Sequence, residues 1–155
     1  MTDTLSQKRR SWNMSRVRSK DTKPEILVRS LLHRNGFRFR LHKKGLPGKP
    51  DIVLGRYRTV IFVHGCFWHR HKGCPDSTTP KTRTAFWEKK FKENMERDKR
   101  TTLALHDLGW NVIVVWECEI HRPENLLKRL KIDIRESSNK AMNTGVYSAA
   151  LNFHR

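Results

Sequence analysis

Histidines are concentrated in one short stretch of this sequence. His64, His69 and His71 fall within eight positions, although the whole chain contains only eight histidines. The unperturbed pKa of histidine lies near neutral pH, so such a group can take a proton from water or give one to a phosphate oxygen. A lone histidine is more often a structural group than a catalytic one. The cluster makes residues 64–71 a candidate site, without deciding which member does what.

A carboxylate lies one hairpin before the histidines. Pro50-Asp51 opens a short apolar segment, and Val63-His64 closes the next one. If the two segments pair as antiparallel strands, Asp51 and His64 face the same end of a sheet. Asp51 and the carbonyl of Val63 could then hold a hard cation such as Mg²⁺, which polarises a phosphodiester and stabilises a departing alkoxide. The simpler alternative, that Asp51 only caps a strand after a proline turn, carries more weight on residue types alone.

All three cysteines fit a metal site. Cys66, His71 and Cys74 have the spacing Cys-x4-His-x2-Cys, and Cys118 follows a later apolar segment. Three thiolates and one imidazole complete a tetrahedral set, which is typical of structural zinc. The alternative is three buried thiols that act as small apolar groups. We favour zinc because residues 64–83 contain few apolar side chains to hold their shape. His69 is not needed for this set and is left free for chemistry.

Large aromatic side chains accompany these sites. Phe67 and Trp68 lie in a glycine-preceded basic loop, and Trp87 opens a later helical pattern. Such side chains can wedge between base pairs, at a cost that is lowest where pairing is already defective. Packing on a sheet is the alternative, and for Trp87 alone it is preferred. Met14 is a further wedge candidate, although a lone methionine in a polar tail usually has no such role.

The net charge indicates a polyanionic partner. Lys and Arg number 33 against 15 Asp and Glu, a formal net charge of +18. So many positive side chains repel one another unless a polyanion lies nearby, and nucleic acid is the leading candidate. No apolar run approaches the roughly 20 residues of a membrane-spanning helix. The first residues also lack the apolar stretch of a secretory signal. We therefore expect a cytosolic protein without disulfides, since its cysteine number is odd.

The element pattern predicts a mixed central sheet flanked by helices, an α/β fold. Thr22 and Glu25 form a capping-box signature for a first helix, which Asn35-Gly36 ends. Strands are expected at residues 37–41, 51–54, 59–63 and 111–116, and helices from Thr84 to Leu108 and from Pro123. The expected apolar helix faces are Ile26, Leu27, Leu31 and Leu32 in the first helix, and Trp87, Phe91 and Met95 in the second.

Three divisions of the chain follow from this pattern. Residues 1–21 are basic and too polar to fold alone, and form an arm that embraces DNA. Residues 22–136 form the domain that carries the candidate sites. Residues 137–155 lose the regular pattern and are a candidate for a disordered C-terminal tail.

Motifs spread over residues 13–118 give a resemblance to a known family. They are Asp21-Thr22 with Glu25, Gly48-Lys49-Pro50-Asp51, Phe62-Val63-His64-Gly65-Cys66-Phe67-Trp68-His69, Thr82-Arg83-Thr84-x-Phe86-Trp87, Asn94-Met95-Glu96-Arg97-Asp98, and Leu108-Gly109-Trp110 with Val115-Trp116-Glu117-Cys118. The chain resembles the very-short-patch-repair (Vsr-type) DNA mismatch endonucleases, which have a restriction-endonuclease-like core of the PD-(D/E)xK type, here with a zinc-stabilised loop. Related nucleases usually place Glu-x-Lys where this chain has Val63-His64-Gly65, so histidine must replace lysine in the chemistry.

The resemblance implies a magnesium-dependent nick 5′ of the thymine in T·G mismatches that arise from 5-methylcytosine deamination. By resemblance, Asp51 and the main-chain oxygen of Val63 bind Mg²⁺. His69 activates water, His64 contacts the scissile phosphate, and Glu25 holds water on the metal. Zinc is held by Cys66, His71, Cys74 and Cys118. The DNA-contacting residues are Phe67, Trp68, Trp87, Met14 and Lys49.

The resemblance also implies a setting for the protein. It would be a monomer on mismatched double-stranded DNA, in the bacterial cytoplasm and associated with the nucleoid, with mismatch-repair proteins as candidate partners. Two alternatives remain open. One is a non-catalytic zinc-containing DNA-binding module, and the other is a restriction-type nuclease of the same fold.

Overall fold

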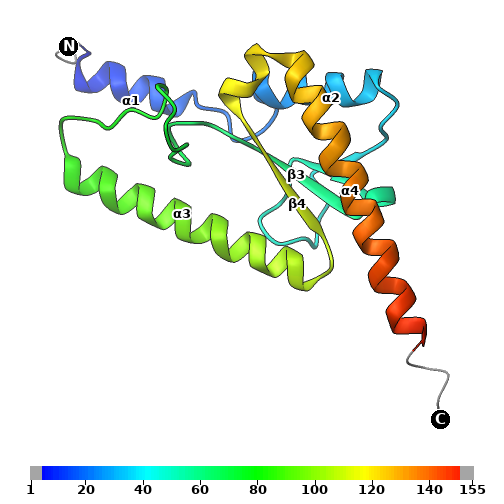
Figure 1. Cartoon of the computed structure of the whole chain (residues 1–155). Coiled ribbons are helices and arrows are strands. Elements are labelled where there is room, and N and C mark those ends of the chain that lie inside the picture. Colours follow the sequence, from blue (N-terminus) through cyan, green and yellow to red (C-terminus); the bar gives the residue numbers. More distant parts are fainter. Residues whose placement is uncertain (1–4, 151–155) are drawn as a thin grey trace.

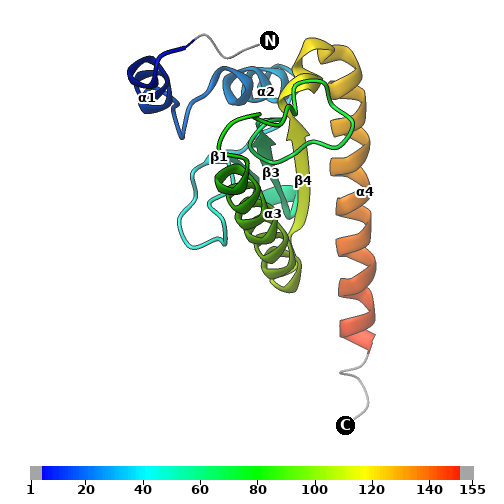
Figure 2. The same cartoon turned by 90° about the vertical axis from the view of Figure 1, so that its left-hand side faces the viewer.

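The computed structural model describes residues 5–150, and the side chains of residues 5–139. A four-stranded sheet lies between helices (Figures 1 and 2). In chain order the helices and strands are α1 (Gln7–Ser15), α2 (Lys23–Arg34), β1 (Arg40–Leu41), β2 (Ile52–Leu54), β3 (Thr59–His64), α3 (Thr84–Asp107), β4 (Asn111–Trp116) and α4 (Pro123–Ala150). Short 3-10 turns, η1 (Gly55–Tyr57) and η2 (Glu117–His121), follow β2 and β4. The mixed α/β architecture is the predicted one.

The strand pairing agrees with the expected antiparallel pairing of the segments that carry Asp51 and His64. The sheet order is β1-β2-β3-β4, with antiparallel pairs β1–β2 and β2–β3 and a parallel pair β3–β4. Ile52 lies opposite Ile61, which brings the start of β2 beside the end of β3. A parallel pair needs a long crossover, and here α3 provides it. His64 pairs with Trp116, so the segment after β4 begins beside the loop after β3.

Alternating side chains divide the core between the two sheet faces. On one face, Ile61 and Val115 pack with residues of α2 and α4, including Leu32 and Leu130. On the other face there is a smaller cluster. It consists of Val53 and Val60 from the sheet, Leu105 from α3, and Trp110, which follows α3. By the same alternation His64 projects toward α3. This second face carries the candidate site.

The start of α2 is built as its sequence predicts. The Thr22 side chain accepts a hydrogen bond from the backbone N–H of Glu25, and its hydroxyl donates to Glu25 Oε1. The expected apolar face is partly wrong, because Ile26 and Leu27 are 51% and 53% exposed. Leu32 is buried as expected, and Val28, one helical turn before it, is buried in place of Ile26 and Leu27.

Other expectations about the elements are corrected in the same way. The strand predicted at residues 37–41 is reduced to Arg40 and Leu41, both exposed, because Phe37 turns into the core instead of pairing. Met95 is 47% exposed rather than on the buried face of α3. The last helix does not end before Ser137, since α4 continues to Ala150; residues 151–155 of the predicted tail lie outside the described residues.

The basic arm contains a helix that the sequence did not predict. α1 is capped by Ser6, whose side chain accepts a hydrogen bond from the Arg9 N–H, and none of its residues is buried. It stands apart from the sheet (Figure 2). No helix within the described residues is both long enough and apolar enough to cross a membrane.

Candidate active site

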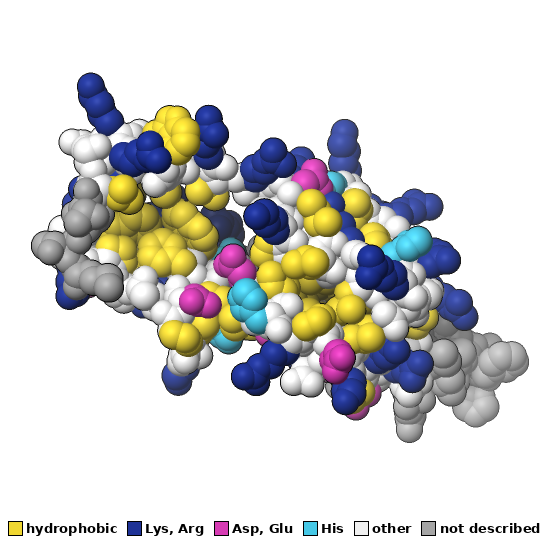
Figure 3. Space-filling view, turned by 90° about the horizontal axis from the view of Figure 1, so that it is seen from above, with side chains coloured by type: hydrophobic (Ala, Val, Ile, Leu, Met, Phe, Trp, Pro, Cys, Tyr) yellow, Lys and Arg dark blue, Asp and Glu magenta, His cyan; other side chains and the backbone are white. Residues whose placement is uncertain are grey.

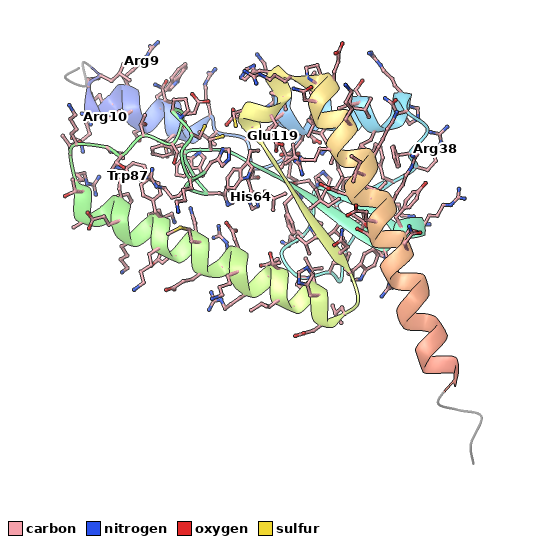
Figure 4. All side chains as sticks on the ribbon, in the orientation of Figure 1. Arg9, Arg10, Arg38, His64, Trp87 and Glu119 are labelled. Atoms are coloured by element: carbon pink, nitrogen blue, oxygen red, sulfur yellow. The ribbon has the colours of Figure 1, made fainter. Side chains whose placement is uncertain are left out.

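A pocket of about 920 Å³ lies where the end of β3 meets α2 and α3. The side chains that the sequence singled out for chemistry come together in its wall, namely Glu25, Asp51, His64 and His69. Three further predicted residues, Val63, Lys49 and Trp68, also line it. In Figure 4, His64 projects from the end of β3 toward α3. Helix α2, the β2–β3 pair and the loop after β3 therefore converge on one cavity.

Asp51 carries a partly buried charge that no basic side chain balances directly. Its Oδ2 accepts a hydrogen bond from the Val63 N–H at 2.8 Å, across the antiparallel β2–β3 pair. Within the described side chains it forms no ion pair. Burial raises the pKa of Asp51 to about 6, and the negative charge of Glu25 adds to this effect. A partly buried carboxylate of this kind fits a divalent cation, whose charge would replace the missing partner.

Glu25 is held firmly in the same wall. Its side chain is 4% exposed, and Oε2 accepts hydrogen bonds from the Asp21 N–H at 2.9 Å and from the Arg29 guanidinium at 3.1 Å. Oε1 accepts from the Thr22 hydroxyl at 3.0 Å. With its oxygens engaged in this way, Glu25 is suited to ordering water in the pocket rather than to serving as a free metal ligand.

His64, His69 and Asp98 form the second part of the site. The two imidazole rings stack with centroids 3.8 Å apart and planes at 9°. His69 Nδ1 lies 2.5 Å from Asp98 Oδ2, and because a carboxylate only accepts, Nδ1 carries the proton and Nε2 is left for the pocket. Burial, with the nearby charge of His69, lowers the pKa of His64 to about 4. His64 is therefore neutral at pH 7.

Asp98 is the residue of the candidate site that sequence reasoning did not single out. Burial alone would raise the pKa of its carboxyl, but the hydrogen bond from His69 and the charges of both histidines bring it below the usual value. Asp98 lies in the stripe of α3 that begins with Trp87, Phe91 and buried Asn94. A carboxylate that continues the buried stripe of a helix, at a spacing of three or four residues, is the signal that could have revealed it.

The Cys–His cluster, defined as Cys66, His71, Cys74 and Cys118, gathers as the sequence predicted. The four ligand atoms all lie within 4.8 Å of one another. His71 Nδ1 lies 3.6 Å from the sulfur of Cys66 and 3.4 Å from that of Cys118. Tetrahedral ligands on zinc are separated by roughly 3.6 Å, given bond lengths of about 2.1 and 2.3 Å. The cluster therefore has the dimensions of a closed four-ligand metal site.

The chain around the cluster is shaped to present these ligands. The His71 N–H donates to the Cys66 carbonyl, and the Cys74 N–H donates to the His71 carbonyl, which folds the loop back on itself. The His71 ring stacks on Trp116 at 4.2 Å and 5°. Burial raises the pKa of Cys66 to about 12 and also raises that of Cys118, so a bound cation would be needed to hold them as thiolates at neutral pH.

The predicted wedge residues form one aromatic cluster beside the pocket. Phe67 contacts Trp68, Trp87 and Phe91, with ring centroids 5.2 to 5.4 Å apart. Phe67 and Trp87 do not line the pocket itself. The Asn94 amide donates to the Trp68 carbonyl at 3.1 Å, which fixes the loop against α3. The cluster lies at the N-terminal end of α3, where Figure 4 labels Trp87.

Two further predicted residues lie at the edges of the site. Lys49 is exposed in the pocket wall, with a left-handed backbone at φ 51°. Gly48 before it packs so closely on α3 that a Cβ atom would lie 2.2 Å from Thr101 Cγ2, which explains the glycine.

Met14 is 47% exposed on α1 and does not line the pocket.

Comparison with known structures gives the fold. The catalytic domain of the homing endonuclease I-Bth0305I superposes with a TM-score of 0.54 over 76% of this chain and 98% of that domain, at 18% identity. This similarity is to a nuclease domain and agrees with the predicted restriction-endonuclease-like core.

Comparison of sequences gives the family. The family described as DNA mismatch endonuclease Vsr matches residues 2–76. The chain is 53% identical over 131 residues to the type II nicking enzyme V.XorIIP of Xanthomonas oryzae, covering 84% of this chain and 96% of that enzyme. It is 45% identical over 126 residues to the DNA mismatch endonuclease Vsr of Escherichia coli, covering 81% and 80% of the two chains. The two relatives match most of the chain, and the chain belongs to the Vsr family of DNA mismatch endonucleases.

Proposed function

We propose that this DNA endonuclease nicks one strand 5′ of the thymine in a T·G mismatch, and that it requires Mg²⁺. The observation that carries the proposal is the convergence of Glu25, Asp51, His64 and the His69–Asp98 pair on one pocket. Asp51 and the main-chain oxygen of Val63 would hold Mg²⁺, which when bound supplies Lewis-acid stabilisation of charge on the phosphodiester.

His69 is the general base of the proposed reaction. Its Nδ1 is tied to Asp98, so its Nε2 takes the proton of a water molecule as that water attacks phosphorus. The bond from phosphorus to one sugar oxygen breaks in the same step, and this oxygen leaves as an alkoxide that takes up a proton from solvent. Asp98 then stabilises the imidazolium, in the manner of a carboxylate that orients a catalytic histidine. The stacked ring of His64 stays neutral and offers one N–H to a phosphate oxygen.

Mismatch selectivity is assigned to the aromatic cluster and the arm. Opening a base step costs a few kcal/mol, and less where the pair is already defective, so wedging by Phe67, Trp68 and Trp87 favours mispaired sites. On α1, exposed Trp12 lies under the guanidinium groups of Arg9 and Arg16, at 4.9 and 4.1 Å. This basic helix would contact DNA together with Met14.

The charge distribution suits a duplex partner. Lys and Arg side chains are scattered over the whole face seen in Figure 3, and Lys43, Lys44 and Lys49 line the pocket. Phosphate contacts from these groups would position the duplex without reading its sequence.

The Cys–His cluster is proposed to hold structural zinc. All four ligands come from the protein, so no coordination position is left for substrate. Zinc would then maintain the loop that carries Phe67, Trp68 and His69.

The experiment compares two duplexes that differ in one base pair, T·G against C·G, incubated with Mg²⁺ and mapped at nucleotide resolution. We expect one nick, 5′ of the mispaired thymine, in the T·G duplex alone. A binding module would hold DNA without cutting it, and a restriction-type nuclease would cut both strands of the paired duplex. Asp51→Asn should bind the T·G duplex and leave it intact.

A further inference from the structure

Arg29 is a largely buried cation that touches the wall of the pocket but does not line it. Its side chain is 13% exposed, and its guanidinium bonds to Asp21 Oδ1 at 2.6 Å and to Glu25 Oε2 at 3.1 Å. The same group lies 3.4 Å from His42 Nε2. Arg29 Nε is buried without a hydrogen-bond partner among the described residues. Holding the guanidinium here therefore has a cost, which its contacts to the three neighbours must offset.

These three neighbours come from different segments around the pocket. Asp21 ends the basic arm, Glu25 lies in the first turn of α2, and His42 begins the connector, residues 42–49, that leads to Asp51. Asp21 and His42 both have left-handed backbones, at φ 53° and 48°. Such conformations cost free energy for residues other than glycine and persist when surrounding contacts hold them.

We propose that Arg29 is a positioning residue, whose guanidinium fixes the Glu25 carboxylate in the pocket wall and ties the arm and the connector to it. The inference rests on the proposed function of the pocket. Glu25 would otherwise be a buried carboxylate near Asp51 with only neutral donors, and it would be free to turn away. Arg29 provides a planar two-point contact with two carboxylates, which lysine cannot reproduce.

The closest match for a control in this chain is Arg129. Its guanidinium also bonds two carboxylates, Glu119 Oε2 at 2.8 Å and Asp133 Oδ2 at 3.0 Å, and its Nε also lacks a partner among the described residues. It does not line the pocket. Arg129→Gln therefore reports the general effect of losing a doubly paired arginine.

The first measurement is the single-turnover nicking rate on the T·G duplex at saturating Mg²⁺. We expect Arg29→Gln to lower this rate by about 10 to 100-fold, the usual effect of removing a residue that orients a site group. Arg29→Lys should lie between this variant and the wild type. If Arg29 acts through Glu25, adding Arg29→Gln to Glu25→Ala should cause no further loss.

The second measurement does not depend on activity. The Asp21 N–H donates to Glu25 Oε2, so its hydrogen-exchange rate reports where that carboxylate lies. We expect faster exchange of this amide in Arg29→Gln and Glu25→Ala, and an unchanged rate in Arg129→Gln. If wild-type protein does not nick T·G, the proposed function fails, and amide exchange alone decides the role of Arg29.

The inference is overturned if Arg29→Gln and Arg129→Gln lose rate equally while exchange of the Asp21 amide stays at the wild-type value. It is also overturned if Arg29→Gln costs as much rate in the Glu25→Ala background as in the wild type. Should Arg29→Gln fail to fold, Arg29→Lys is put through the same two measurements.

Discussion

The pocket and the Cys–His cluster lie on neighbouring stretches of chain. They differ in whether their polar side chains have suitable partners within the protein. In the cluster, four ligand atoms within 4.8 Å surround one point, as a closed metal site requires. In the pocket, Asp51 keeps a partly buried charge with no ion partner among the described side chains, and its pKa rises to about 6. We infer that the cluster stabilises the structure of the loop after β3. The pocket, in contrast, lowers the folding stability of the protein because it holds a charged group that the reaction requires.

The largest expected effect is loss of the cluster. Cys66→Ala removes a buried ligand of the proposed zinc site, and zinc binding to such sites contributes on the order of 10 kcal/mol to folding. We expect loss of the bound zinc, disorder of the loop after β3 and loss of nicking. Metal content by elemental analysis and thermal unfolding check this. Unchanged folding in the zinc-free variant would remove the contrast between the two regions.

A substitution in the pocket should leave the fold intact and stop the reaction. Asp51→Asn removes a charge that is proposed to hold Mg²⁺, and metal stabilisation of the transition state amounts to several kcal/mol, or about 10³-fold in rate. Single-turnover nicking and circular dichroism test the two halves of this prediction. Loss of helix and sheet signals together with activity would contradict it.

The same variant should be more stable than the wild type at high pH without added magnesium. The folded-state pKa of Asp51 is raised from 3.8 to about 6, so its contribution to stability is present below pH 4 and is lost as pH rises through 6. Asp51→Asn removes that penalty and keeps an acceptor for the Val63 N–H. We expect a gain of up to about 3 kcal/mol at pH 8 and less than about 1 kcal/mol at pH 4. Urea unfolding of zinc-loaded protein checks it, and an equal difference at both pH values would contradict it.

A smaller effect is expected at the residue that orients the base. Asp98→Asn retains the size of the side chain but not its charge, so it no longer stabilises a charged His69. Removing such an orienting partner costs about 10 to 100-fold in activity. We expect kcat to fall by this factor while the affinity for mismatched DNA is retained. Reduced DNA affinity with unchanged kcat would show that Asp98 acts in binding instead.

The prediction from sequence succeeded where local patterns determine the structure. Alternation and turn residues placed β2 and β3 antiparallel, and this pairing brings Asp51 to the Val63 N–H. Cysteine spacing predicted the Cys–His cluster, because knuckle turns are local and β4 lies beside β3.

The prediction from sequence failed where contacts between residues far apart in the chain determine the structure. Asp98 lies 29 residues from its partner His69, so no local pattern joins them. Ile26 and Leu27 fit a helix face by type but turn outward, because Val28 and Leu32 already face the sheet. Helix α1 buries none of its residues, so its sequence has no apolar periodicity from which a helix could be predicted.

We infer that a divalent cation at Asp51 acts on the scissile phosphate. T·G duplexes in which sulfur replaces one non-bridging oxygen of that phosphate test this contact. Mg²⁺ binds oxygen and avoids sulfur, whereas Mn²⁺ accepts softer ligands. We predict that one sulfur isomer slows nicking with Mg²⁺ and that Mn²⁺ restores the rate. Equal slowing with both metals, for both isomers, would contradict the claim.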